Sequence, residues 1–302
     1  QKTAYEIMPS LVGSEMCIRD SFGTTHKRFF IDDSSLAERL PEAVLHMSEP
    51  MVAQDAIAFY LLAEQVSKDI KVVQSGQGAD EVFAGYFWHQ KLHQTSKDEL
   101  QVFKQHYFDR SHQEIQSALC PNYLSRDFTS ELVSSLLDKK NGEDFIDTFL
   151  RADITTFIVD DPIKRIDNMT MAWGLEARVP FLDIDLVKTA IQIPAEIKLK
   201  EGGKYPLRAI ARDLLPNEVI DRPKGYFPVP ALKYPRGVFL NLMQEILTSK
   251  ACKERGLFEY AYIEKLMNNP EKYTTPIEGN KLWHMALLEL WLQANLDSLI
   301  SR

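Results

Sequence analysis

The stretch Lys71–Tyr86, KVVQSGQGADEVFAGY, constrains the fold of this chain more than any other part of the sequence. Its opening is a short β-branched run, which favours a strand. The run ends in the turn Ser75–Gly78, which contains two glycines, and a helix is expected to start at Ala79. A strand, a glycine turn and a helix in this order are typical of an α/β unit.

The residues before this stretch favour a parallel sheet. KRFFI at 27–31 is expected to form a short strand, and Asp32 is expected to cap a helix that runs to Leu45. A second, amphipathic helix is expected at 53–68. Strand, helix, helix, strand, glycine turn and helix together predict an α/β unit built on parallel strands.

Strands become scarce after about residue 95, and the rest of the chain is expected to be helical. The helix that is expected near the end is apolar nearly all round, so it should be buried inside a helical layer. Three prolines and one glycine within 222–230 exclude a helix there and predict an ordered loop. The fold class is therefore α/β becoming mostly α, with a remnant of parallel sheet followed by a helical layer. Helices are expected near 97–118, 128–138, 143–158, 184–192, 204–214, 258–267 and 279–299.

The glycine turn has the chemistry of an anion site. Glycines let the backbone approach a phosphate, and the free N–H groups at a helix start favour negative charge. Asp80 and Glu81 in the first helical turn suit this site if Mg²⁺ bridges a carboxylate and a phosphate. The alternative is a plain strand-to-helix turn in which both carboxylates interact with the helix dipole.

Residues 161–183, DPIKRIDNMTMAWGLEARVPFLD, set many charges among apolar side chains. Buried charges persist only when they are paired or bound to a ligand. This pattern alone fits a functional site and a structural ion-pair network equally well. His89 and His93 have the i, i+4 spacing of two metal ligands, but no third ligand is found at a telling distance, and a surface pair is the better interpretation.

Charge and composition exclude several classes of protein. The chain has 302 residues, a net charge of −8 and no basic run with interleaved aromatics, so a nucleic-acid partner is not expected. No apolar stretch is long enough to cross a membrane. The three cysteines, Cys17, Cys120 and Cys252, are too sparse for a disulfide framework and suit the reducing cytoplasm.

The opening 21 residues, QKTAYEIMPSLVGSEMCIRDS, have no clear period and no connection to the rest of the sequence. They resemble translated adapter sequence, so residues 1–21 are expected to be non-native; a natural disordered tail is the alternative. On the first interpretation the native protein extends further upstream.

Two strings resemble motifs of the asparagine synthetase family. SGQGADEVFAGY, from Ser75, resembles its SGEGADE motif, and the string from Asp167 to Asp183 resembles its second motif, which ends in E-x-R-x-P-[FY]-L-D. The resemblance runs from about Phe22 to the C-terminus. It implies an ATP-pyrophosphatase domain of the PP-loop (adenine nucleotide α-hydrolase-like) type, with an α/β core at 22–118 and a helical remainder at 119–302.

The resemblance also assigns roles to individual residues. It implies that the turn residues Ser75, Gly76, Gln77 and Gly78 face ATP, and that Asp80 is a Mg²⁺ ligand.

Glu176 is implied to lie at the acyl-transfer centre, next to Gln77, while Arg178 and Asp183 are expected to be structural. Lys224 matches a lysine that contacts the α-phosphate and the departing pyrophosphate, and Lys204 and Arg208 are weaker candidates for the same site.

The family's first phosphate loop, Ser-Gly-Gly-x-Asp-Ser, and its N-terminal glutaminase domain are missing from this sequence. Ammonia is therefore expected to come from a glutaminase domain outside the chain, and the chain alone is expected to be inactive. The complete protein is expected to be an amidotransferase, with a homodimer as its expected assembly.

Gln77 stands where the family usually has a glutamate, and a glutamine cannot act as a base. Several strings, such as RPKGYFPVPALKY at 222–234, resemble the N-acetylglutaminylglutamine amidotransferase branch, which is linked to an amidated dipeptide osmolyte. The expected reaction is ATP-dependent amidation of a small-molecule carboxylate through an acyl-adenylate. The alternatives are a glutamine-hydrolysing asparagine synthetase that acts on aspartate, and a catalytically dead helical or nucleotide-binding module.

Overall fold

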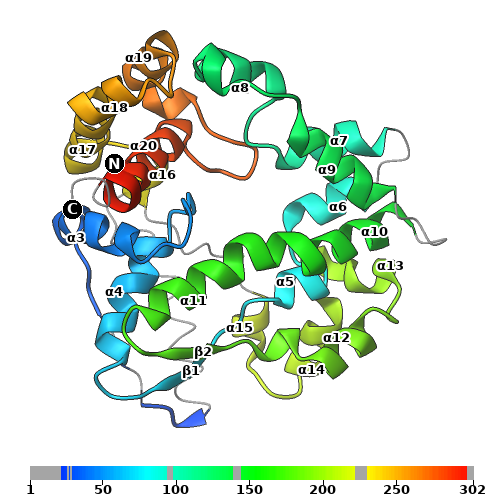
Figure 1. The fold of residues 1–302 in the computed structure, drawn as a ribbon. Helices are drawn as coiled ribbons and strands as arrows, with labels where there is room; N and C mark the ends of the chain where they lie inside the picture. Colours follow the sequence, from blue (N-terminus) through cyan, green and yellow to red (C-terminus); the bar gives the residue numbers. More distant parts are fainter. Residues whose placement is uncertain are drawn as a thin grey trace.

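The structure is mostly helical and contains one small parallel sheet, which lies near the lower side of the view in Figure 1. The computed structural model describes residues 22–25, 27, 29–93, 98–138, 144–221 and 230–297. Within these ranges the sheet has two strands, β1 (Val72–Gln74) and β2 (Glu176–Arg178). The mostly helical chain with a small parallel sheet agrees with the expected fold class.

The two strands pair in parallel, with Val72 opposite Glu176 and Gln74 opposite Arg178. The Ser75 amide extends the ladder by donating to the Arg178 carbonyl oxygen at 2.8 Å. Sequence reasoning missed β2, because Glu-Ala-Arg has low strand propensity and only pairing with a distant segment makes it extended.

The strand that was expected at 27–31 is wrong for the residues that the structure describes. Residues 27 and 29–31 carry no strand, because none of the described segments pairs with them. Phe30 is largely exposed rather than packed in a sheet.

The first two helices begin close to where the sequence predicts them. In α3 (Asp33–Leu45), the Asp32 carboxylate caps the helix by accepting from the Ser35 amide at 2.9 Å. The second is α4 (Ala56–Val66), against which α11 (Lys164–Met171) packs. Residues about 100 positions apart in the chain thus meet beside the sheet.

The main core joins these helices to the end of the chain, where α17 (Gly237–Thr248), α19 (Tyr260–Asn268) and α20 (Lys281–Leu292) lie (Figure 1). Helix α20 is buried on nearly every side, as its composition predicts, and the π turn Gln293–Asp297 comes after it. Its buried Glu289 is compensated by Arg255, whose Nε lies 3.0 Å from Glu289 Oε2.

A second core of mixed aliphatic and aromatic side chains lies between α6 (Phe87–His93), α7 (Glu99–Tyr107), α9 (Phe128–Leu137) and α10 (Phe145–Ala152). A third, small cluster beside α5 (Ala79–Val82) and α12 (Ile184–Ala190) contains Val82, Phe83 and Ala190. The main core uses helices from both sides of residue 118. The division expected at that residue stays a prediction.

The remaining helices are short. They are α8 (His112–Ala118), α13 (Ala195–Lys198), α14 (Tyr205–Ala211), α15 (Asn217–Ile220), α16 (Pro230–Lys233) and α18 (Lys250–Arg255). Four 3₁₀ turns, Pro121–Tyr123, Pro180–Leu182, Lys200–Gly202 and Pro270–Lys272, and two π turns, Asp153–Phe157 and Val159–Ile163, complete the described elements. The single helix expected near 97–118 is two helices, α7 and α8.

The surface pair expected at His89 and His93 is wrong for His89. His93 is exposed, but His89 is fully buried and its Nε2 lies 2.9 Å from Asp153 Oδ2. The Tyr86 amide donates to His89 Nδ1 at 3.4 Å, which leaves the proton on Nε2 to face the carboxylate. The i, i+4 spacing gives no sign that the rings of Tyr86 and Phe149 pack against His89.

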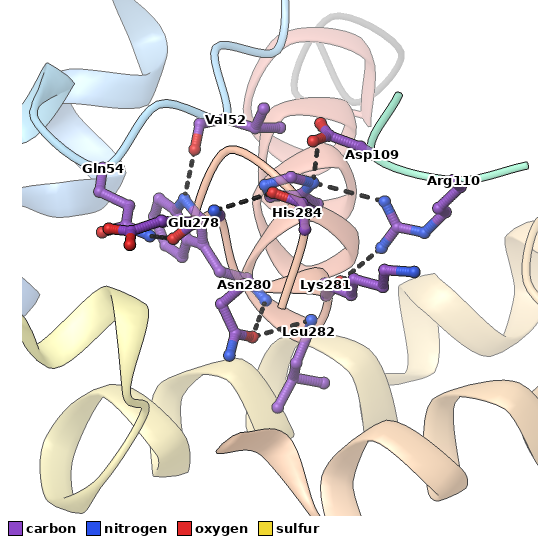
Figure 2. A network of polar contacts seen from close by, with 12 residues as sticks. Val52, Gln54, Asp109, Arg110, Glu278, Asn280, Lys281, Leu282 and His284 are labelled. Carbon is purple, nitrogen blue, oxygen red and sulfur yellow. Dashed lines mark hydrogen bonds and ion pairs between the residues drawn. The ribbon is translucent and has the colours of Figure 1, made fainter. Parts of the chain in front are cut away.

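A hub of polar contacts at the start of α20 holds several loops together (Figure 2). Asn280 caps the helix by accepting from the Leu282 amide at 2.9 Å, and its amide group donates to the carbonyl oxygens of Lys233 and Pro270. Trp283 Nε1 donates to the Val52 carbonyl oxygen at 2.8 Å. The segment before α4, helix α16 and the start of α20 are therefore fixed to one another.

None of the helices in the described part of the chain is both long and apolar enough to cross a lipid bilayer.

The buried imidazole of the hub should make stability depend on pH. Burial, Arg110 and Lys281 lower the pKa of His284 to about 3 from 6.5. Between pH 6.5 and pH 3, His284 is therefore protonated in the unfolded chain but neutral in the folded chain. The free energy of unfolding falls as the pH drops from about 6.5 toward 3. At pH 5 this effect reduces the unfolding free energy by about 2 kcal/mol.

The His284→Asn variant retains a hydrogen-bond acceptor for Arg110. Between pH 7.5 and pH 5, we expect its free energy of unfolding to fall by about 2 kcal/mol less than that of wild type. Urea unfolding at both pH values measures the difference. The exposed His93→Asn variant should show the wild-type dependence. Equal losses in wild type and His284→Asn would contradict the prediction.

Candidate functional site

The carboxyl ends of β1 and β2 lie at the same edge of the sheet because the strands are parallel. In open α/β sheets this edge is where ligands bind. Three segments meet there: residues 75–80 after β1, residues 83–85 after α5, and residues 201–204 before α14. We call this place the Asp80–Lys204 corner.

The glycine turn has the geometry that the sequence predicts. Gly78 adopts a left-handed φ of 93° and α5 begins at Ala79. A Cβ on Gly78 would lie 2.6 Å from the Leu182 side chain, so glycine is required there for conformation and for space. Nothing lies within 4 Å of a Cβ built on Gly76, which leaves the backbone open at that point.

Asp80 forms an ion pair with Lys204, whose Nζ lies 3.0 Å from Asp80 Oδ1. Both side chains are partly exposed, at 22% for Asp80 and 27% for Lys204. They meet across Gly85, because a Cβ there would lie 2.2 Å from Asp80 Oδ1 and 2.9 Å from Lys204 Cδ. The absence of a side chain at position 85 therefore allows the pair to form.

Lys204 reaches this position through a strained turn. Four successive residues, Glu201 to Lys204, have left-handed φ values of 53°, 85°, 106° and 56°. For the two that are not glycine, this conformation costs of order 1–3 kcal/mol each. Gly203 lies so close to residue 84 that a Cβ would be 2.2 Å from the Ala84 carbonyl oxygen. The Lys204 amide then donates to the Phe83 carbonyl oxygen at 2.9 Å.

Glu81 points away from Asp80 and into the protein. It is buried and accepts a hydrogen bond from the Tyr86 hydroxyl at 2.7 Å. Burial is the main cause that raises its pKa, and the nearby carboxylates of Asp153 and Asp80 raise the pKa further. Of the two carboxylates in this helical turn, Asp80 alone lies at the corner.

Residues 75–78, which are expected to face ATP, come directly before Asp80 at the carboxyl end of β1, whereas Glu176 is the first residue of β2. Glu176 lies opposite Val72, the first residue of β1, whereas Gln77 lies beyond the last residue of β1. The half-exposed Glu176 carboxylate is 3.9 Å from Arg178 Nε. The strand register therefore separates their backbones along the sheet, and the expected pairing of Glu176 with Gln77 stays a prediction.

The other candidates divide into three groups. Lys224 lies outside the described residues. Lys204, which the sequence ranks below Lys224, lies at the corner, and the Arg208 amide donates to its carbonyl oxygen. Asp183 has the structural role expected of it, because its carboxylate accepts from the Asp185 and Leu186 amides at the start of α12.

Part of the charged block at 161–183 forms a structural network. The nearly buried Arg165 lies 3.0 Å from Asp55 Oδ1 and 2.6 Å from Asp161 Oδ2. Burial raises the pKa of Asp55, and the Arg165 guanidinium opposes that rise. Since Arg165 is in α11 and Asp55 is at the start of α4, the pair joins the two packed helices.

Asp80 suits a metal that is shared with a nucleotide better than a metal held by protein alone. Among the described residues, no group of three or more His, Cys, Asp or Glu side chains is arranged to hold a metal ion. Mg²⁺ commonly takes one or two carboxylates and fills its remaining positions with phosphate oxygens and water. One partly exposed carboxylate beside an open glycine turn fits that arrangement.

A side chain at position 85 should separate the ion pair. We expect Gly85→Ala to destabilise the protein by about 1 kcal/mol, because the added methyl group displaces the partly exposed side chains of Asp80 and Lys204. Gly76→Ala is the matched control, since its Cβ would meet nothing within 4 Å. Chemical denaturation of both variants measures the effect, and equal losses would contradict the proposed close contact.

Comparison with known proteins gives the same family that the motifs suggest. The sequence model of the asparagine synthase family matches residues 17–293. The match begins at residue 17, so the boundary expected at residues 21 and 22 stays a prediction.

Several curated relatives are asparagine synthetases. The chain is 24% identical over 311 residues to the putative asparagine synthetase [glutamine-hydrolyzing] of Mycobacterium tuberculosis (strain ATCC 25618 / H37Rv), which covers 90% of this chain and 47% of the relative. It is 27% identical over 293 residues to asparagine synthetase [glutamine-hydrolyzing] 3 of Bacillus subtilis (strain 168), covering 91% and 46%. The chain spans about half the length of these relatives. Because the family model covers most of its length, the chain belongs to the asparagine synthase family.

Proposed function

We propose that this chain is part of an enzyme that uses ATP to convert a carboxylate into an amide, with ammonia obtained from glutamine. The observation that supports this most is the Asp80–Lys204 corner: an open glycine turn, a carboxylate and a lysine at the carboxyl edge of a parallel sheet. Family membership supports the same class of reaction.

The chemistry requires activation because a carboxylate is inert toward ammonia. Transfer of the carboxylate to the α-phosphate of ATP releases pyrophosphate and makes AMP the leaving group. In the proposal, the backbone amides of the glycine turn face the phosphates. Asp80 would hold Mg²⁺ in part, and the metal would supply positive charge to the phosphate oxygens.

Among the described residues, Lys204 places its ammonium group at the corner. In its pair with Asp80, the ammonium group is 3.0 Å from the carboxylate oxygen. A phosphate group at the turn offers the same ammonium another oxygen partner, and charge stabilisation of a leaving pyrophosphate is a role that lysine commonly has. Lys224 stays a proposal for the same role on the basis of its sequence motif.

We propose N-acetylglutaminylglutamine as the carboxylate substrate. Gln77 supports this choice, because the turn has an uncharged amide where a glutamate is usual for the family. The second candidate is aspartate, and it is favoured by the names of the relatives, which are asparagine synthetases.

Pyrophosphate release distinguishes the two substrates. The gene product that contains this chain is incubated with ATP, Mg²⁺ and glutamine, and with either the dipeptide or aspartate. We expect release that depends on the dipeptide. Release that depends on aspartate would replace the proposed substrate, and nucleotide binding without release would favour a catalytically dead module.

The Asp80→Asn variant tests the role of Asp80 directly. We expect Asp80→Asn to lower substrate-dependent ATP–pyrophosphate exchange by about 100-fold or more, because the amide loses the negative charge that the metal needs. Asp185→Asn removes an exposed carboxylate on α12 and serves as the control. Equal rates for Asp80→Asn and wild type would exclude Asp80 from the site.

A further inference from the structure

Arg212, directly after α14, connects two segments beside the corner. Its Nη2 lies 3.2 Å from Glu201 Oε2 and 2.8 Å from Asp221 Oδ1. Its Nη1 donates to Asp221 Oδ2 and to Asn217 Oδ1, both at 3.1 Å. One guanidinium group thus joins the turn that precedes α14 to both ends of α15.

The contact with Glu201 has a mechanical consequence for Lys204. Glu201 is the first of the four left-handed residues and Lys204 is the last. A strained turn persists only when the contacts around it hold it in place. At the Lys204 end, the contacts are the Phe83 carbonyl oxygen and the Asp80 carboxylate. At the Glu201 end, the contact is Arg212.

We propose that Arg212 is a positioning residue that holds the 201–204 turn, so that Lys204 lies against Asp80 and sets the affinity of the corner for phosphate groups. This inference rests on the proposed function. The contacts of Arg212 are with Glu201, Asn217 and Asp221 rather than with the glycine turn, so it acts through Glu201.

The geometry requires arginine in particular. The planar guanidinium contacts Asp221 through two nitrogens and still has a hydrogen-bond donor for Glu201. A lysine has the same charge but only one nitrogen, so it can satisfy part of this set. Because exposed ion pairs contribute little to global stability, loss of Arg212 should loosen the turn without unfolding the protein.

The experiment compares wild type, Arg212→Ala, Arg212→Lys and Arg236→Ala in the gene product that contains this chain. Arg236 is a matched control, since it is an exposed arginine paired with Glu271 at 2.6 Å, in a different part of the chain. Hydrogen exchange at the Lys204 amide reports whether the turn is held. Calorimetric titration with magnesium pyrophosphate reports the affinity for phosphate groups.

We expect Arg212→Ala to exchange the Lys204 amide about three- to fivefold faster and to bind magnesium pyrophosphate about two- to fourfold more weakly, with Arg212→Lys in between. Arg236→Ala should match wild type in both measurements. Unchanged exchange in Arg212→Ala would overturn the inference, and faster exchange with unchanged affinity would also overturn it by leaving Arg212 a purely structural role. Wild-type protein that binds no pyrophosphate would refute the proposed function, while the exchange measurement would still decide whether Arg212 holds the turn.

Discussion

The parallel pairing of β1 with β2 is the interaction on which the rest of this architecture depends. It joins two segments about 100 residues apart, and the Ser75 amide continues the ladder to the Arg178 carbonyl oxygen. Because the strands are parallel, they end at the same edge of the sheet. Strand β1 leads into the glycine turn, and β2 leads toward α12. Helix α11, which comes before β2 in the chain, contacts both α4 and β2.

A second close approach of the backbone completes the corner. Gly85 and Gly203 let residues 83–85 and 203–204 cross at distances that a Cβ would prevent. The crossing turns Lys204 toward Asp80, and it requires left-handed backbone at residues that are not glycine, including Ala84 with a φ of 56°. Strain of this kind collects where a fold holds a side chain in a position that local propensity does not favour.

Sequence reasoning succeeds where local chemistry decides the structure and fails where distant contacts decide it. The Asp32 cap, the helix start at Ala79 and the burial of α20 are all consequences of short-range patterns. Strand β2 and the Asp80–Lys204 pair are not, because each depends on a partner more than 100 residues away. The sequence gives only a weak indication of the crossing: Gly85 follows Asp80 and Glu81, and Gly202-Gly203 lies between Glu201 and Lys204.

The ion pairs of this chain fall into two classes, and the difference bears on function. Removal of the cation from a mostly buried pair, such as Arg165 from beside Asp55, leaves a charge without a partner and costs about 3–5 kcal/mol. A partly exposed pair contributes about 1 kcal/mol or less, because water replaces the lost partner. A lysine that must exchange a carboxylate for a phosphate oxygen therefore has to belong to the second class. The pair of Asp80 with Lys204 belongs to it. The turn that carries Lys204 is therefore held by several contacts together, which include the hydrogen bond of the Lys204 amide to the Phe83 carbonyl oxygen and the ion pair of Glu201 with Arg212.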